Sequence, residues 1–382
     1  MKPHDMQPHA SPGGSRRRRP PVIATRRMVA LTGGLCAGAS GMVLIRHLSA
    51  GSAGSASTMQ PPSGSFGGGA NTMQYDYSGT NSVSLTVGED STTVIDGTDI
   101  TASSSGSNGV FATDSGTVLV NDTSIETMAD NSRGLDATYG GTISANKITA
   151  DTQGGHSAIV ATDRGGGSIS LADATLSTAG SGSLLLYSTG DIQVNNVSGT
   201  SSGSQIAGME GLNTILIKDS TLESTVTGKT ASDPIANGII IYQSTSGGVT
   251  ADTISSVDLY LLDGAAWIGA ATITDNAAAG SGTGTASDAP ITVNVDGTST
   301  WVVAKDTTIS ALNVASDGDG NAVTIVANGK TVVSGSGDVT VMVTGSYSTS
   351  VSAGSDTELS SDTIDRSEFD SRFGTSTAWT MA

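Results

Sequence analysis

A small group of polar side chains in the middle of the chain has the composition of a sugar-binding or sugar-cleaving site. His156 is the only histidine after residue 56, and Asp163 and Arg164 follow it closely. Enzymes that cleave polysaccharides on repetitive β folds gather carboxylates with Lys or Arg on one face, so Lys147 and Asp151 belong to the same group. Tyr139 joins it because alignment of the coils places it in one column with Asp163. The alternative is a solvated column of turns. We take Tyr139, His156, Asp163 and Arg164 as ligand-binding candidates and assign no catalytic residue.

A second group of oxygen ligands lies near the C-terminal end. Asp317-Gly318-Asp319-Gly320-Asn321 places side-chain oxygens at alternate positions, as at the start of a calcium loop. The acid expected at the twelfth position is missing, because residue 328 is Asn. Asp-Gly and Gly-Asn pairs also form ordinary turns. Calcium binding by Asp317, Asp319 and Asn321 therefore stays open beside a plain turn, and the sequence calls for no other metal or cofactor.

Aromatic side chains are the remaining groups that could bind sugars. Trp267, Tyr139, Tyr187 and Tyr242 could stack on sugar rings, whereas Trp301 lies in a periodic strand and is expected to pack in the core. No glycine-rich phosphate loop precedes a helix, and one histidine cannot build a His-based zinc site. The Gly-His-Gly and Arg-x-Lys patterns of pectin-degrading enzymes are also missing. The sequence therefore indicates no catalytic mechanism.

The amino-acid composition indicates which secondary structure must position these residues. Of 382 residues 51 are Gly, while aromatic residues make up 4% and charged residues 14%. Abundant small, β-branched and turn-forming residues favour many short strands joined by turns. The net charge is −18 although residues 1–56 are basic, so the rest of the chain is strongly acidic. An acidic body repels phosphate backbones, which argues against a nucleic-acid partner.

Residues 1–56 have the order of an export signal. A basic stretch, Arg16–Arg19 followed by Thr25–Arg27, precedes the uncharged run Met28–Ile45, and small residues follow. Thr25–Arg27 is similar to a twin-arginine signal. The alternative is an uncleaved anchor, since a run of this length nearly spans a bilayer. We expect export to the cell surface or medium, with membrane contact only through an uncleaved leader.

The body repeats with a period near 24 residues. The segment Asn108–Gly116 returns as Arg133–Gly141 and again as Ser157–Gly165. Two further sets of apolar positions keep phase with it, at Val118, Ile143, Ile169, Ile192 and Ile215, and at Ile100, Ile125, Ile148, Leu176, Val197 and Leu222. One coil cannot bury these side chains alone, but stacked coils can, so the pattern predicts a parallel β-solenoid. Division of its length by the period predicts roughly eleven coils.

The repeat also predicts where individual residues lie. Aligned coils place Asp114, Tyr139 and Asp163 in one column, and Ser132 and His156 in another. Arg133 and Arg164 are expected outside or at turns, because burying an unpaired guanidinium is costly. The residues expected to point inward are Leu135, Ile143, Ile148, Ile159 and Ile169.

Two motifs resemble a known family. The Trp301 strand, Val295–Val303, with the following Thr307–Val314, resembles the coils of bacterial autotransporter passenger domains of the pertactin-like kind. Ser132–Ile143 is similar to a motif of adhesin-like bacterial surface proteins. The resemblance implies an all-β fold, a right-handed single-stranded parallel β-helix, after a disordered or helical leader.

These observations divide the chain into four parts. They are an export leader at 1–56, a flexible linker at 57–74, the β-helix at 75–350 and a polar tail at 351–382. The resemblance implies a non-enzymatic, adhesin-like protein that presents an acidic surface to glycans or surface proteins. Two alternatives stay open: a polysaccharide lyase or hydrolase that uses the Lys147–Arg164 region, and a structural spacer.

Overall fold

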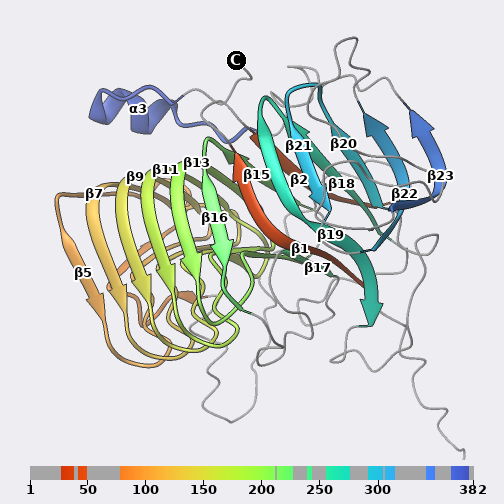
Figure 1. Ribbon diagram of the computed structural model, residues 1–382. Coiled ribbons are helices and arrows are strands. Elements are labelled where there is room, and N and C mark those ends of the chain that lie inside the picture. The colour runs from red at the N-terminus through yellow and green to blue at the C-terminus, as the bar shows by residue number, and fades with distance from the viewer. Residues whose placement is uncertain are drawn as a thin grey trace, which may run out of the picture.

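Short parallel strands dominate the structure. The computed structural model describes residues 27–37, 42–49, 78–210, 213–226, 239–242, 255–275, 291–303, 306–314, 341–348 and 363–377. Strands account for 60% of the structure, with one short helix, α3 (Ser367–Phe373). The parallel sheets stack as a β-solenoid with coils of about 25 residues (Figure 1). The expected all-β solenoid is therefore confirmed.

Each coil contributes to three sheets. The first sheet contains β3 (Ser84–Val87), β6 (Val110–Thr113), β8 (Leu135–Thr138), β10 (Val160–Asp163), β12 (Leu186–Ser188), β14 (Ala207–Glu210) and β17 (Ile239–Tyr242). Four long strands each enter both remaining sheets: β7 (Thr117–Thr127), β9 (Thr142–Thr152), β11 (Ser168–Thr178) and β13 (Asp191–Ser201). Their first halves form the second sheet with β4 (Thr92–Asp96) and β15 (Thr214–Lys218). Their second halves form the third sheet with β5 (Asp99–Ala102) and β16 (Thr221–Ser224).

A single residue turns each long strand from the second sheet into the third. Its φ angle is positive, for example 49° at Asp122 and 54° at Lys147. Parallel pairing is interrupted at this residue and resumes after it. Asp and Asn adopt the left-handed conformation more readily than other residues with a Cβ atom, and they occupy most of these bends.

Inward side chains form continuous columns through the solenoid. Val118, Ile143 and Ile169 are paired in register and are all 0% exposed. The five residues predicted to point inward are each 0–1% exposed, which confirms the prediction, namely Leu135, Ile143, Ile148, Ile159 and Ile169. Burial of such side chains from successive coils supplies the stabilisation that one coil lacks.

The third predicted set of apolar positions is in fact two columns. One contains Thr123, Ile148, Ala174 and Val197, and the other contains Ile125, Ala150, Leu176, Gly199 and Leu222. A coil with a large residue in one column has a small residue in the other. At Gly199 a Cβ atom would lie 2.9 Å from Leu185 Cδ1, so no space is left for a second large side chain. The side-chain volume of each coil is therefore nearly constant. Because each coil has one large apolar residue in either column, the two columns look like a single set in the sequence.

Hydroxyl groups satisfy the backbone at one buried corner. Thr152 Oγ1 donates a hydrogen bond of 2.6 Å to the carbonyl of Ser157, and Thr127 does the same to Ser132. The Ser132 amide donates to Ser157 Oγ at 2.9 Å, one coil further along. The hydroxyl groups of Thr127, Thr152 and Ser157 are therefore tolerated in the interior because each has a hydrogen-bond partner.

Part of the leader is folded into the sheets. Residues expected to be disordered or helical form β1 (Arg27–Ala37) and β2 (Met42–Ser49). β1 pairs antiparallel with β19 along its whole length and also with β16 and β17, while β2 pairs antiparallel with β15 and β18. Residues 42–45 are at most 1% exposed and pack on Leu216 and Leu262 and into the main core. The apolar run thus forms strands because it covers two sheet edges.

The region after β17 stacks with other spacings. It contains β18 (Ser255–Leu262), β19 (Ala265–Asp275), β20 (Ile291–Val295), β21 (Thr300–Val303), β22 (Thr307–Val314) and β23 (Val341–Ser348). β18 pairs parallel with β20 at an offset of 34 residues, whereas β20 pairs with β22 at an offset of 19. The regular solenoid therefore has about 6 turns rather than the predicted eleven.

Two tryptophans stack inside this second region. The Trp267 and Trp301 rings lie 4.8 Å apart at an interplanar angle of 8°, and both side chains are 0% exposed. The core position expected for Trp301 is confirmed. Trp267 cannot stack on a sugar ring, because its partner ring and the core enclose it.

In the described part of the chain, no helix has the length and apolar character needed to cross a membrane.

Candidate functional site

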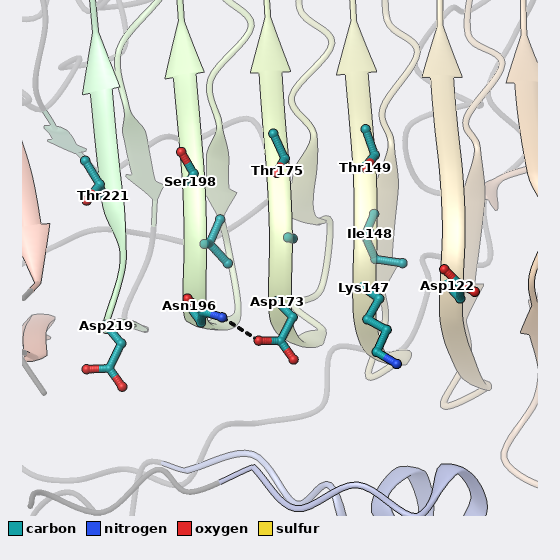
Figure 2. Close-up of a pocket in the computed structure, with 12 residues that line it drawn as sticks. Asp122, Lys147, Ile148, Thr149, Asp173, Thr175, Asn196, Ser198, Asp219 and Thr221 are labelled. Carbon is teal, nitrogen blue, oxygen red and sulfur yellow. Dashed lines mark hydrogen bonds between the residues drawn. The ribbon is translucent and has the colours of Figure 1, made fainter. Parts of the chain in front are cut away.

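An elongated groove follows the bends of the long strands (Figure 2). It has a volume of about 620 Å³ and extends across the coils from β7 to β16. The bend residues project from its lower edge in the figure, one from each coil, and we call them the bend row. The bend row consists of Asp122, Lys147, Asp173, Asn196 and Asp219.

Hydroxyl side chains form a second row beside the first. Thr149, Thr175, Ser198 and Thr221 lie two residues after successive bends and are exposed. The residues between the two rows point inward, because side chains alternate along a strand. Each coil therefore repeats the same outward pair, a bend side chain and a hydroxyl group, at intervals of about 4.8 Å.

The bend row is acidic and partly connected. Asn196 Nδ2 donates a hydrogen bond of 2.6 Å to Asp173 Oδ1. Asp219 lies 3.3 Å from the ammonium group of Lys218, which is itself 6% exposed. Lys147 is exposed and occupies the position between Asp122 and Asp173. With three carboxylates and one ammonium group, the row offers mainly hydrogen-bond acceptors.

The structure brings three of the four sequence candidates together, away from the groove. Tyr139 donates its backbone N–H to the Arg164 carbonyl at 3.1 Å, and Arg164 Nε lies 3.9 Å from Asp163 Oδ1. These residues lie at the C-terminal ends of β8 and β10. His156 is exposed before the start of β10, over Gly182, where a Cβ atom would stand 2.8 Å from Nδ1. The four candidates therefore do not form one site.

Two predicted columns were wrong by one residue. Asp163 pairs with Thr138, not with Tyr139. Ser132 aligns with Ser157, since its amide donates to Ser157 Oγ, and His156 precedes that column. The true offset between these coils is 25 residues, whereas matching the Ala-Thr pairs at 137–138 and 161–162 gives an offset of 24.

Arg133 lies in the loop between β7 and β8, as expected, but it is buried. It is 8% exposed, and its Nη2 lies 2.8 Å from Asp163 Oδ2 while Nε lies 3.7 Å from Asp136 Oδ2. Two carboxylates compensate the buried guanidinium, which removes the penalty that the prediction assumed. Arg164 lies at the turn after β10 and is partly exposed, as expected.

Sequence reasoning missed most of the bend row. Only Lys147 was named, as part of a different group. An Asp or Asn between two short alternating segments in each coil could have indicated the bend row, but Lys147 interrupts this pattern.

The structure does not describe the calcium candidates Asp317, Asp319 and Asn321 or the side chain of Tyr242. Within the described ranges, no three His, Cys, Asp or Glu side chains gather as a metal site.

No protein family, curated protein or solved structure matches this chain. The repeat pattern and the groove are therefore the basis for any functional assignment.

Proposed function

We propose that this chain is an exported, non-enzymatic surface protein that binds glycans along the groove. The bend row carries the proposal, because it presents one polar side chain from each of five successive coils. A polysaccharide is a repeating, hydroxyl-rich chain, so it can make equivalent hydrogen bonds at each step. Carboxylate and amide groups such as Asp173 and Asn196 are effective acceptors and donors for such hydroxyls.

The charge of the groove indicates a class of glycan. Asp122, Asp173 and Asp219 outnumber Lys147, so the groove carries a net negative charge. Like charges across an interface are unfavourable, whereas opposite charges favour association. We therefore expect neutral or amino sugars to bind better than uronic-acid or sulfated polymers.

Two carboxylates of the bend row already make polar contacts with protein groups. Asp173 accepts a hydrogen bond from Asn196, and Asp219 faces Lys218. Carboxylate and amide groups arranged in this way can position the hydroxyl groups of a glycan.

The groove can be tested with a matched pair of double variants in the full chain. Asp173→Ala with Asn196→Ala removes the centre of the bend row, and Ser177→Ala with Thr200→Ala removes exposed side chains further along the same strands. Binding to neutral, amino and acidic polysaccharides is measured by affinity electrophoresis, and new reducing ends are assayed in parallel. We expect the first pair to weaken binding about tenfold or more, and the second to leave it unchanged. Equal losses, or released reducing ends, would overturn the proposal.

Export is a separate part of the proposal, supported by the basic and apolar order of residues 1–56. A reporter protein fused to these residues should leave the bacterial cytoplasm, and Arg26→Lys with Arg27→Lys should retain it. Retention of both reporters would contradict export. N-terminal sequencing of the exported chain then reports whether β1 and β2 remain attached.

A further inference from the structure

The C-terminal segment 363–377 is bound to the solenoid through one arginine. Arg366 is only 4% exposed. Its Nη1 donates hydrogen bonds to the Ser170 carbonyl at 2.6 Å and to Ser170 Oγ at 3.0 Å, and Nη2 donates to the Ala145 carbonyl at 3.2 Å. The guanidinium also lies 4.6 Å above the ring of Phe369, which is 0% exposed. One side chain thus bridges two neighbouring coils.

The solenoid supplies the hydrogen-bond acceptors for this arginine. Ala145 lies in β9 and Ser170 in β11, which pair in register. Ser170 belongs to a column that alternates with the inward residues and so points away from the core. From β7 to β13 the members of this column are at most 3% exposed, namely Leu119, Ser144, Ser170 and Gln193. The outer face of the second sheet is therefore a covered surface, with α3 beside it (Figure 1).

The segment has its own local structure. Ser367 donates from its backbone N–H and its hydroxyl to the Asp365 carboxylate, and Thr375 Oγ1 donates to Asp370 Oδ1 at 2.7 Å. Gly374, with a φ of 64°, ends α3. Residues 349–362 connect the segment to β23, and 14 residues can span up to roughly 48 Å when extended. The segment is thus a compact ligand at the end of a long connection.

The arginine is held by neutral acceptors. Its direct partners are carbonyl and hydroxyl oxygens, while Asp370 and Asp173 act on it over longer distances. Burial lowers the pKa of Arg366 to about 10, and the two carboxylates offset this only in part. A charge that loses its water without a direct counter-ion gains little net free energy, so docking should be reversible.

We propose that segment 363–377 is an exchangeable ligand, and that the segment of one copy docks on the β9–β11 face of a second copy. The second copy is the occupant that fits, because its segment carries the same Arg366 and can make the same contacts with Ser170 and Ala145. Exchange would join copies side by side. Asp173, a member of the bend row, interacts electrostatically with Arg366, so the docking site lies near the groove, and each linked pair would carry two grooves. Only this last consequence rests on the proposed glycan binding.

Two complementary variants of the full chain test the exchange. Arg366→Ala leaves the site empty and disables the segment, whereas Ser170→Trp fills the site and leaves the segment intact. Each variant alone should be monomeric, and an equimolar mixture should form a one-to-one complex in light scattering coupled to gel filtration. The matched control mixes Arg366→Ala with the double variant Arg366→Ala/Ser170→Trp and should stay monomeric. A first mixture that behaves like the control would overturn the proposal.

A peptide measurement keeps the proposal testable if Ser170→Trp fails to fold. A labelled peptide of residues 363–377 is titrated into the full-length Arg366→Ala chain and into the unaltered chain. It should bind the Arg366→Ala chain about ten times more tightly, because that site is open. The same peptide with Lys at position 366 should lose this preference, since a point-like ammonium cannot bridge two carbonyl groups as a planar guanidinium does. Equal affinities for the two chains, or no binding to either, would contradict exchange.

Discussion

The regular solenoid and the region after β17 use the same parallel pairing with different spacing. In the solenoid, Thr117 pairs with Thr142 and Thr142 with Ser168, so successive coils are nearly equal in length. After β17, offsets of 34 and 19 residues alternate. Equal coils place every bend directly above the one before it. Unequal coils do not, so only the first region can present a continuous row of binding side chains.

The two regions also differ in what completes them. The solenoid satisfies its corners with its own hydroxyl groups, as Thr152 does for Ser157. The second region borrows β1 and β2, which pair antiparallel with β18 and β19. The coils from β7 to β13 therefore pair with neighbouring coils, whereas the last solenoid strands, β15–β17, and the irregular region after them both pair with β1 and β2.

The largest expected effect comes from removing residues 1–56. Without β1 and β2, strands β18 and β19 lose their antiparallel partners along most of their lengths. We expect hydrogen exchange in β18–β23 to accelerate by orders of magnitude, while β7, β9 and β11 stay protected. If both regions lose protection together, the claimed independence of the solenoid is wrong.

A smaller but still severe effect is expected from Ile143→Asp in the solenoid. This change places a carboxylate between Val118 and Ile169 in a fully buried column, which costs several kcal/mol. Thr142→Asp, one residue earlier on the outer face, should change the free energy of unfolding by less than about 0.5 kcal/mol. Denaturant unfolding measures both. Similar losses from the two variants would mean that the inside and outside faces are assigned wrongly.

The smallest effect concerns the corner hydroxyls. Thr152→Val removes the donor to the buried Ser157 carbonyl and should cost about 1–3 kcal/mol. Thr149→Val, exposed on the same strand, serves as the control and should be nearly neutral. A solenoid that tolerates both changes equally would show that its corner hydrogen bonds are dispensable.

The three strands of each coil could be predicted because the buried positions recur at a nearly constant spacing along the chain. Positions such as Ile143 and Ile169 recur at the coil period, and one face of each strand must be apolar. The number of coils was overestimated because the strand pattern persists after β17 although its spacing changes. An apolar strand looks the same at an offset of 25 or 34 residues.

Features that depend on distant partners could not be predicted. The burial of Arg133 requires Asp163, which is 30 residues away. The strands in the leader require edges provided by β15–β19, and the docking of Arg366 requires carbonyls some 200 residues earlier, at separations of 196 and 221. The bend row was partly readable, since Asp122, Asp173 and Asn196 recur once per coil. It was overlooked because a polar turn residue usually has no function.

The most direct test of the account is the dependence of binding on ligand length. The bend row from Asp122 to Asp219 covers four steps of about 4.8 Å, or about 19 Å. Titration calorimetry of the full chain with a graded series of oligosaccharides from a polymer that binds should show affinity rising with each added sugar until the ligand spans this length. It should then level off. An affinity that is already complete with one or two sugars, or that keeps rising beyond the row, would contradict a groove built from one side chain per coil.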